Sequence, residues 1–269
     1  MTANIIPISD WEDPSIADYT SVRERDLTGR QNKFIIEGKV TLEVALTRSR
    51  FAIESVLLNR SRASSLLPEI QTHLGDIPVY VTDQAVMDKI AGFPVHRGIL
   101  ACGRKPEPPP LQDWITGLDG AQTLVVAIGL SNHDNAGAIF RNCAALGADA
   151  VLLDQESCDP LYRKSIRVSA GTALWLPFHH GATPDAVFNA LSTAGYHVWT
   201  LTPRDDATSL YEARRPEKLA IVLGPEGPGL TDEQIASGTA IRIPMSNEVD
   251  SLNVATSLAI ALSVRFSAG

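Results

Sequence analysis

The chain has 269 residues, of which 44% are hydrophobic, 20% charged and 6% aromatic, and its formal net charge is −8. This composition is typical of a globular protein and excludes collagen-like, disordered and disulfide-scaffold chains. The length suits two ordinary domains or one large domain, and the net charge argues against a protein that binds nucleic acid over its whole surface.

The N-terminal part alternates short apolar runs with a helical pattern. Strands are predicted at residues 34–36, 55–58, 79–81 and 98–101, and a helix is predicted over 38–47, where Val40, Val44 and Ala45 recur at helical spacing. This alternation indicates a small α/β sandwich with parallel or mixed strands.

A proline-rich segment then interrupts the chain. Four of the five residues from Pro106 to Pro110 are proline, which disfavours both a helix and a central strand and predicts a stiff extended linker. We therefore divide the chain into a domain over residues 1–105, a linker over 106–113 and a second domain over 114–269.

The second domain shows a clearer alternation. Strands are predicted at residues 123–128, 150–153, 197–201, 219–223 and 241–243, and helices at 136–146, 184–193 and 252–266. The strands are short, continuous and rich in Val, Leu and Ile, as expected of a mostly parallel sheet with both faces covered. Ligands of such sheets bind beyond the carboxyl ends of the strands, so the loops at those ends are the places to seek chemistry.

Signals for membrane insertion or secretion are not found. The most apolar long stretch, residues 252–266, is too short to span a bilayer, and the N-terminus lacks the basic and apolar regions of a signal peptide. Cys102, Cys143 and Cys158 form no Cys-x-x-Cys motif, and the six histidines show no metal-ligand spacing. We expect a cytoplasmic protein that does not enter a membrane and holds no metal.

One segment of this acidic chain is locally basic. Residues 23–62 contain nine basic and five acidic side chains. A solvated helix face is the simpler interpretation of such a charge run when it is taken alone, and a patch that contacts phosphates is the functional one.

Three loops in the second domain carry residues suited to chemistry. The first, residues 132–141, follows a strand and opens a helix, with Asn135 as a natural N-cap and Arg141 nearly two turns further on. The second, residues 223–231, contains three glycines and two prolines before a helix capped by Thr231; it lacks the Lys-Ser/Thr ending of a P-loop and the GxGxxG spacing, which disfavours ATP and NAD.

The third loop joins residues 243–245 to the start of the last helix, for which Asp250 or Ser251 is the expected N-cap. That helix is apolar on both sides, which predicts that it is buried against another layer or a second subunit. Each of the three loops has a purely structural explanation when it is considered alone.

In their order and spacing, however, the three loops resemble the consecutive motifs of the SpoU (TrmH) family of RNA 2′-O-ribose methyltransferases, within the SPOUT superfamily. The resemblance runs from Asn135 to Val254, and residues 159–171 are also similar to a stretch of that family. Residues 34–38 and 96–99 resemble the small substrate-binding domain that often precedes this catalytic domain, which is similar to a ribosomal-protein-like RNA-binding fold.

The resemblance implies a C-terminal α/β domain with a mostly parallel sheet and a deep trefoil knot. It also implies a homodimer through the knotted domain, RNA as substrate (ribosomal RNA in preference to tRNA) and S-adenosylmethionine as cofactor. Carried over by position, the residues that bind the cofactor are Leu223, Gly224, Gly227, Ile243, Met245 and Leu252.

The resemblance further implies methyl transfer to a ribose 2′-hydroxyl, with Arg141 as the activating residue. Because a guanidinium stays protonated in proteins, a grip on the adjacent phosphate suits Arg141 better than the role of a base. Glu226 either holds Arg141 in an ion pair or accepts the proton itself. The residues expected to act in catalysis are Asn135, Arg141, Glu226, Ser251 and Asn253.

Two other functions remain open. The first is a non-catalytic RNA-binding dimer on the same fold, and the second is methylation of a nucleobase instead of a ribose. All five expected catalytic residues are present, which counts against a non-catalytic dimer. The sequence does not distinguish methylation of a ribose from methylation of a base.

Overall fold

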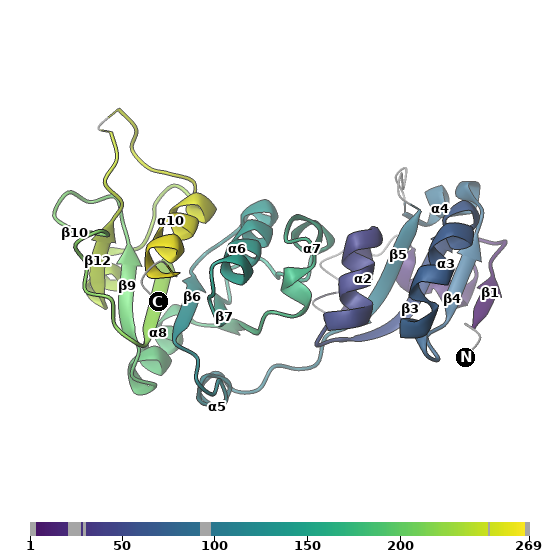
Figure 1. The fold of residues 1–269 in the computed structure, drawn as a ribbon, viewed down its shortest axis with the longest axis horizontal. Helices are drawn as coiled ribbons and strands as arrows, with labels where there is room; N and C mark the ends of the chain where they lie inside the picture. Colours follow the sequence, from purple (N-terminus) through teal and green to yellow (C-terminus); the bar gives the residue numbers. More distant parts are fainter. Residues whose placement is uncertain (1–3, 21–27, 29–30, 92–97, 247, 267–269) are drawn as a thin grey trace. The chain divides into compact units, whose positions relative to one another are not determined.

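The computed structural model describes residues 4–20, 28, 31–91, 98–246 and 248–266 (Figure 1). The chain forms two compact units. The N-terminal unit contains residues 1–107 and 160–175, and the C-terminal unit contains residues 108–159 and 176–269. Residues 160–175, which we expected within the second domain, pack with the N-terminal unit.

The N-terminal unit is built on a five-stranded mixed sheet. Its strand order is β1-β4-β3-β5-β2, with β4 parallel to both neighbours and β5 antiparallel to β2 and β3. The strands are β1 (Ile5–Pro7), β2 (Lys33–Glu37), β3 (Ala52–Asn59), β4 (Val79–Thr82) and β5 (Ile99–Arg104).

Helices cover both faces of this sheet, because its strands are apolar on both sides. The helical elements are η1 (Pro14–Tyr19), α2 (Lys39–Arg48), α3 (Arg60–Leu74) and α4 (Gln84–Ala91). On one face, Ile16 and Tyr19 of η1 and Met87 of α4 pack in a core with Leu57 and Leu100 of the sheet. Helices α2 and α3 lie side by side on the other face (Figure 1).

Residues 160–175 form α7 (Arg163–Val168) and η2 (Thr172–Leu174). Glu37, at the end of β2, is almost buried, and its carboxylate lies 3.7 Å from the guanidinium of Arg163 and 3.6 Å from that of Arg167. The backbone N–H of Arg50 donates to the carbonyl of Leu174 at 3.0 Å. A buried carboxylate needs such partners, so these contacts hold the segment on the N-terminal unit.

The C-terminal unit is built on a seven-stranded parallel sheet of order β10-β12-β9-β11-β6-β7-β8. Every described pair in it is parallel. The strands are β6 (Thr123–Ala127), β7 (Ala150–Asp154), β8 (Phe178–Ala182), β9 (His197–Leu201), β10 (Thr208–Ser209), β11 (Leu219–Leu223) and β12 (Thr239–Arg242).

Its helices are α5 (Leu111–Thr116), α6 (His133–Ala145), α8 (Pro184–Thr193), α9 (Asp232–Ala236) and α10 (Val254–Phe266). Helices α5, α8 and α9 bury one face of the sheet through Ile115, Val187 and Ile235. Helix α10 follows β12 in the chain but packs on α6, beside the central strands. The described residues of the segment between them, 243–246 and 248–253, lie at the carboxyl ends of β9 and β11, the region in which the family resemblance implies the knot.

The sequence-based fold class is confirmed: the first sheet is mixed and the second is parallel. The strands predicted at 197–201 and 219–223 have the observed bounds. Residues 111–113, the end of the predicted linker over 106–113, belong to α5. Among the residues that the structure describes, no helix combines the length and the apolar character needed to cross a bilayer.

Candidate active site

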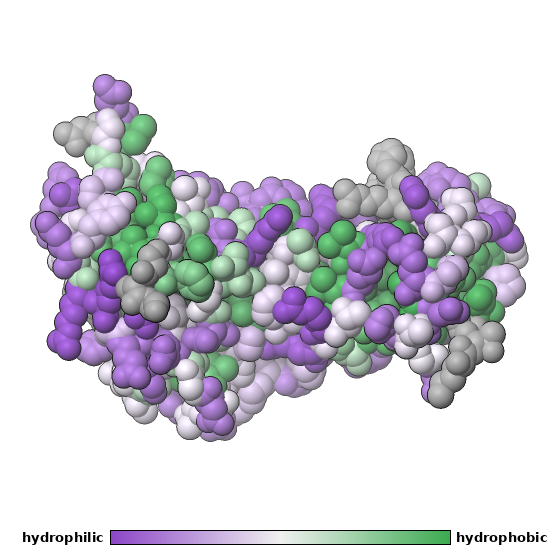
Figure 2. All heavy atoms as spheres, viewed as in Figure 1, coloured by the Kyte–Doolittle hydropathy of each residue, from purple (hydrophilic) through white to green (hydrophobic). Residues whose placement is uncertain are grey.

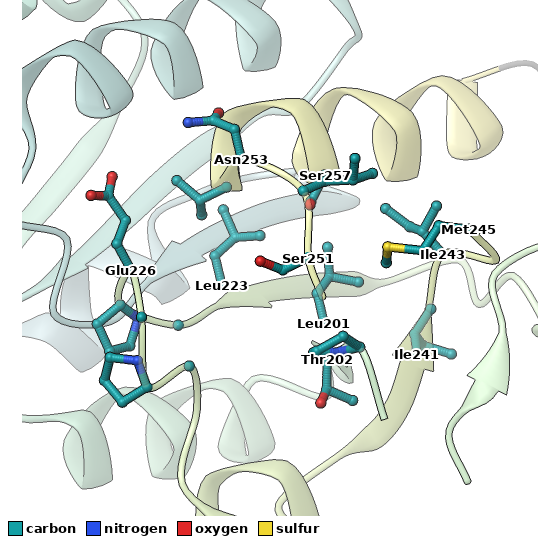
Figure 3. Close-up of a pocket in the computed structure, with 18 residues that line it drawn as sticks. Leu201, Thr202, Leu223, Glu226, Ile241, Ile243, Met245, Ser251, Asn253 and Ser257 are labelled. Carbon is teal, nitrogen blue, oxygen red and sulfur yellow. The ribbon is translucent and has the colours of Figure 1, made fainter. Parts of the chain in front are cut away.

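A cavity of about 360 Å³ opens at the carboxyl ends of β9, β11 and β12 (Figure 3). Glu226 and Asn253 lie at one end of it, and Ile243 and Met245 lie at the other (Figure 3). The residues that line it are Leu201, Thr202, Pro203, Leu223, Gly224, Pro225, Glu226, Gly227, Pro228, Gly229, Ile241, Ile243, Met245, Ser251, Leu252, Asn253, Val254 and Ser257.

The loop after β11 forms one wall of this pocket, and its glycines are needed for its shape. A Cβ atom on Gly224 would lie 2.5 Å from the backbone nitrogen of Leu230, so a side chain there would force the loop apart. Gly227 has φ of 90°, which L residues rarely adopt, and nothing lies within 4 Å of its missing side chain. The loop ends where predicted, at Thr231, whose side chain forms a capping box with Gln234.

Three side chains from distant parts of the chain form a continuous chain of hydrogen bonds at the pocket. The Asn253 amide donates to the Asn135 side-chain oxygen at 2.9 Å, and the Asn135 amide donates to the Glu226 carboxylate. Asn135 is 8% exposed, so its amide has to be paired within the protein. This chain joins α6, the loop after β11 and the start of α10.

Two capping predictions are corrected by this arrangement. Asn132, not Asn135, caps α6, because its side chain accepts from the N–H of Asp134. Asn253, not Asp250 or Ser251, accepts from the first backbone N–H groups of α10, at 2.9 Å from Ala255 and 3.2 Å from Thr256. Asn135 is thereby available for the pocket and is not used by the helix end.

Arg141 lies exposed on α6. No hydrogen bond or ion pair joins it to another residue that the structure describes. The ion pair considered between Arg141 and Glu226 is absent from the described contacts, since the Glu226 carboxylate is held by Asn135 instead. A protonated guanidinium without an internal partner is available to an anion from outside.

All six residues expected to bind the cofactor line the pocket, and so do Glu226, Ser251 and Asn253. Asn135 reaches the pocket through its bonds to Glu226 and Asn253, whereas Arg141 is not among the lining residues. The sequence-based prediction missed Leu201, Thr202 and Pro203. These residues follow the carboxyl end of a correctly predicted strand that neighbours β11, which is the signal that identifies them.

Cysteines near the site are protonated at neutral pH. Burial raises the pKa of the Cys158 thiol to about 11, with smaller contributions from the charges of Asp159 and Glu226. Burial also raises the pKa of Cys143, which lies inside α6. Neither thiol is therefore suited to act as a nucleophile.

Three of the six described cations in the window of residues 23–62 pair with carboxylates of the N-terminal unit. Lys33 lies 2.6 Å from Asp18, Lys39 lies 2.5 Å from Glu69, and Arg60 lies 2.8 Å from Asp83. Arg48 instead stacks on the Trp175 ring, 4.1 Å from its centroid. Arg23, Arg25 and Arg30 of the same window, and Arg97, which was also expected to contact RNA, lie outside the described residues.

Asp18, Glu54 and Cys102 come together within the N-terminal unit at a distance that suits a metal ion. Lys33 and Arg104 already donate to these carboxylates. Burial raises the pKa of the Cys102 thiol to about 12. The cluster is a set of ion pairs.

The comparisons with known proteins address the same regions. The SpoU rRNA Methylase family matches residues 122–263, which is more than half of the chain and contains α6, the loop after β11 and α10. An uncharacterized tRNA/rRNA methyltransferase of Mycobacterium tuberculosis is 36% identical over 97% of this chain and 92% of its own length. The chain belongs to the SpoU rRNA Methylase family.

Further similarities extend over both units. The 23S rRNA (guanosine-2′-O-)-methyltransferase RlmB of Photobacterium profundum is 29% identical over 85% of this chain and 95% of its own length. A solved RNA 2′-O ribose methyltransferase superimposes with a TM-score of 0.76, at 28% identity over 97% of this chain and 98% of its own. An rRNA methyltransferase from Sinorhizobium meliloti, solved with AdoMet bound, has a TM-score of 0.78 at 19% identity, covers 98% of each chain and shows the fold alone.

Membership assigns the broad activity. The protein is an RNA methyltransferase of the SpoU family. Its matched segment contains Asn135, Arg141, Glu226, Ser251 and Asn253, so the hydrogen-bonded chain and the exposed arginine lie within the part of the molecule that the family defines.

Proposed function

We propose that this protein transfers the methyl group of S-adenosylmethionine to a ribose 2′-hydroxyl of structured RNA, with ribosomal RNA favoured over tRNA. The observation that carries the proposal is the chain Asn253–Asn135–Glu226, which ends in a carboxylate that lines the pocket. Its family relatives support the choice of RNA, since RlmB is named for 23S rRNA and for the guanosine 2′-oxygen.

The pocket suits the proposed cofactor. Its volume of about 360 Å³ lies within the range of small-molecule sites. Leu223, Ile243 and Leu252 offer apolar side chains to flank an adenine ring, and the glycines at 224 and 227 leave backbone groups open to its polar atoms. When bound, S-adenosylmethionine supplies a methyl group attached to a positively charged sulfonium sulfur.

Arg141 is proposed to hold the phosphate next to the reacting ribose. A guanidinium forms two parallel hydrogen bonds to a phosphate, which fixes the 2′-oxygen and stabilises the negative charge that develops on it. The absence of an internal partner for Arg141 among the described residues leaves both of its donor edges for this contact.

Glu226 is proposed to take the proton of the 2′-hydroxyl. Asn135 donates to one carboxylate oxygen, Oε1, which fixes the orientation of the group. The second oxygen is left to accept the proton, while the 2′-oxygen would bond to the methyl carbon as the carbon–sulfur bond breaks and the sulfur leaves as a neutral thioether. Ser251 and Asn253 line the same pocket and are proposed to position the ribose.

Methyl transfer is tested with methyl-tritiated S-adenosylmethionine and total cellular RNA, followed by fractionation of the labelled species. We expect label in RNA with the wild type and a loss of about a hundredfold or more in kcat for Arg141→Ala, with unchanged cofactor affinity. Arg214→Ala, another exposed arginine of the C-terminal unit, is the matched control and should retain full activity. Full activity of Arg141→Ala would contradict the proposed mechanism.

Two alternatives give different results in the same experiments. A non-catalytic RNA-binding scaffold shows no affinity for S-adenosylmethionine in calorimetry and no label in RNA. Methylation of a base leaves the label on the nucleobase after nuclease digestion and mass spectrometry, whereas the proposed reaction leaves it on the ribose.

We further propose that two chains associate through the C-terminal unit and that the N-terminal unit binds the substrate RNA. Hydrophobic residues gather on the surface over α10 (Figure 2), where Phe266 is 62% exposed. Such a surface is typical of a protein–protein contact.

A further inference from the structure

A second cavity of about 360 Å³ lies in the N-terminal unit, between the first turn of α2, residues 62–69 of α3 and the start of β5. It is remote in sequence from the SpoU motifs. We name it the α2–α3 groove, and its lining residues are Lys39, Val40, Arg62, Ser65, Leu66, Glu69 and Ile99.

The floor of the α2–α3 groove is apolar. Leu66 and Ile99 are almost fully buried beneath it, while Val40 on its rim is 61% exposed. Figure 2 shows exposed hydrophobic residues among hydrophilic ones over α2 and α3. An aliphatic side chain exposed to water beside a groove offers apolar surface, and a flat ligand ring can bury that surface.

The walls of the groove carry charge. Lys39 and Glu69 form a direct ion pair at 2.5 Å on its wall, and the ammonium and the carboxylate keep further donor and acceptor positions. Arg62 is exposed, and within the part of the chain that the structure describes no carboxylate pairs with it. Its neighbour Arg60 differs, because Asp83 binds its guanidinium at 2.8 Å. Arg62 therefore brings an uncompensated positive charge to the groove.

We propose that the α2–α3 groove binds one unstacked nucleotide of the substrate RNA, with the base on the apolar floor and a phosphate on Arg62. Proteins recognise RNA mainly at loops and bulges, where bases leave the stack and expose both a flat face and a hydrogen-bonding edge. The apolar floor formed by Val40, Leu66 and Ile99 can pack on the face of the base. The Lys39–Glu69 pair can form hydrogen bonds with the edge of the base, and the positive charge of Arg62 attracts the phosphate.

The inference rests on the proposed function, because it takes RNA as the substrate. It differs from a general basic patch, since most described cations of residues 23–62 are held by carboxylates or a ring. It predicts recognition of one extruded nucleotide other than the methylated one, so the groove contributes to RNA affinity and not to the chemical step.

The test uses the full-length protein and a fluorescein-labelled hairpin RNA with a single-nucleotide bulge, alongside the fully paired hairpin. Fluorescence anisotropy should show that the wild type prefers the bulged RNA. Arg62→Ala should weaken binding of the bulged RNA about tenfold, whereas Arg60→Ala, which removes a paired arginine on the same helix, should change it by less than about twofold.

A second variant fills the groove without changing the charge. Ser65 is exposed, so Ser65→Trp should leave the thermal unfolding temperature unchanged, abolish the preference for the bulge and preserve binding of the paired hairpin. Wild-type affinity in both Arg62→Ala and Ser65→Trp would overturn the inference, and so would an equal loss in Arg60→Ala.

Activity assays separate this inference from the proposed function. With RNA that the wild type methylates, Arg62→Ala and Ser65→Trp should raise KM for RNA and leave kcat and cofactor affinity unchanged. If the wild type methylates RNA while both variants keep its KM, the groove proposal fails and the proposed function stands. If the wild type does not methylate any RNA, the proposed function fails.

Discussion

Asn135 joins α6 to the loop after β11 and to the start of α10 through its side-chain hydrogen bonds. Its side chain accepts from Asn253 and donates to Glu226, so Asn135→Asp keeps the shape but places two carboxylates in contact. Two such groups cannot both be ionised at low cost, and a protonated Glu226 cannot accept the proton of the 2′-hydroxyl. We expect kcat to fall about tenfold to a hundredfold at neutral pH and the acid limb of the pH–rate profile to move to higher pH.

The measurement is kcat against pH, from about pH 6 to about pH 9, for the wild type and Asn135→Asp. Asn189→Asp, a change of the same kind at an exposed position of α8, is the matched control. Profiles that superimpose would show that the carboxylate at 226 is not the proton acceptor.

Single residues also show where the sequence is informative. The motif spacing identified Asn135, Glu226 and Asn253, and their side chains do meet. Their partners differ from the prediction, in which Glu226 either pairs with Arg141 or accepts the proton and Asn135 caps a helix. Which of several polar groups meet depends on the path of the loop after β11, and that path is a property of the folded chain.

At the scale of elements, the loop after β11 sets the shape of the pocket. A methyl group at Gly224 would lie 2.5 Å from the Leu230 nitrogen and 2.7 Å from the Gly229 carbonyl carbon, and backbone atoms cannot turn aside as side chains do. We expect Gly224→Ala to weaken S-adenosylmethionine binding about tenfold or more and to destabilise the fold by about 1–3 kcal/mol.

Gly195→Ala separates these two effects. Gly195 has φ of 75° and lies before β9, at the opposite end of the strand from the pocket, with nothing within 4 Å of its missing side chain. The change should destabilise the fold by about 1–2 kcal/mol and leave cofactor affinity unchanged. Calorimetric titration and thermal unfolding of both variants measure the difference, and equal affinities would show that Gly224 does not shape the cofactor site.

The elements that the sequence predicts well are those whose apolar pattern is continuous. Strand β11 consists of five buried residues and was predicted with its observed bounds. Strand β8 escaped prediction because His179, His180 and Gly181 interrupt its pattern, and α3 escaped because Pro68 lies in its interior. In both cases packing against neighbours outweighs a weak local preference.

At the scale of the whole molecule, the net charge of −8 does not show that basic side chains of the N-terminal unit are paired with carboxylates of the same unit. Counting charges along residues 23–62 suggested a basic surface, but Asp18, Glu69 and Asp83, which neutralise three of its cations, lie outside that window. A count of charges along a sequence window predicts a charged surface only when the carboxylates that neutralise its cations lie in the same window. Arg62 and Arg141 have no carboxylate partner in the part of the chain that the structure describes, and they are the arginines proposed to bind RNA phosphates.

The proposed dimer is the remaining property of the whole molecule, and α10 provides its test. This helix is apolar on both sides, yet only Ala255, Leu258, Ala261 and Leu262 are buried. Phe266 remains 62% exposed, so an apolar surface is left for a second chain.

We expect the wild type to sediment as a dimer and Phe266→Glu to raise the dimer dissociation constant about tenfold or more, because the charge would have to leave water. Tyr211→Glu introduces the same charge at a ring that is 61% exposed elsewhere in the C-terminal unit and should leave the dimer intact. A wild-type monomer would refute the dimer, and a dimer unaffected by Phe266→Glu would place its interface away from the end of α10.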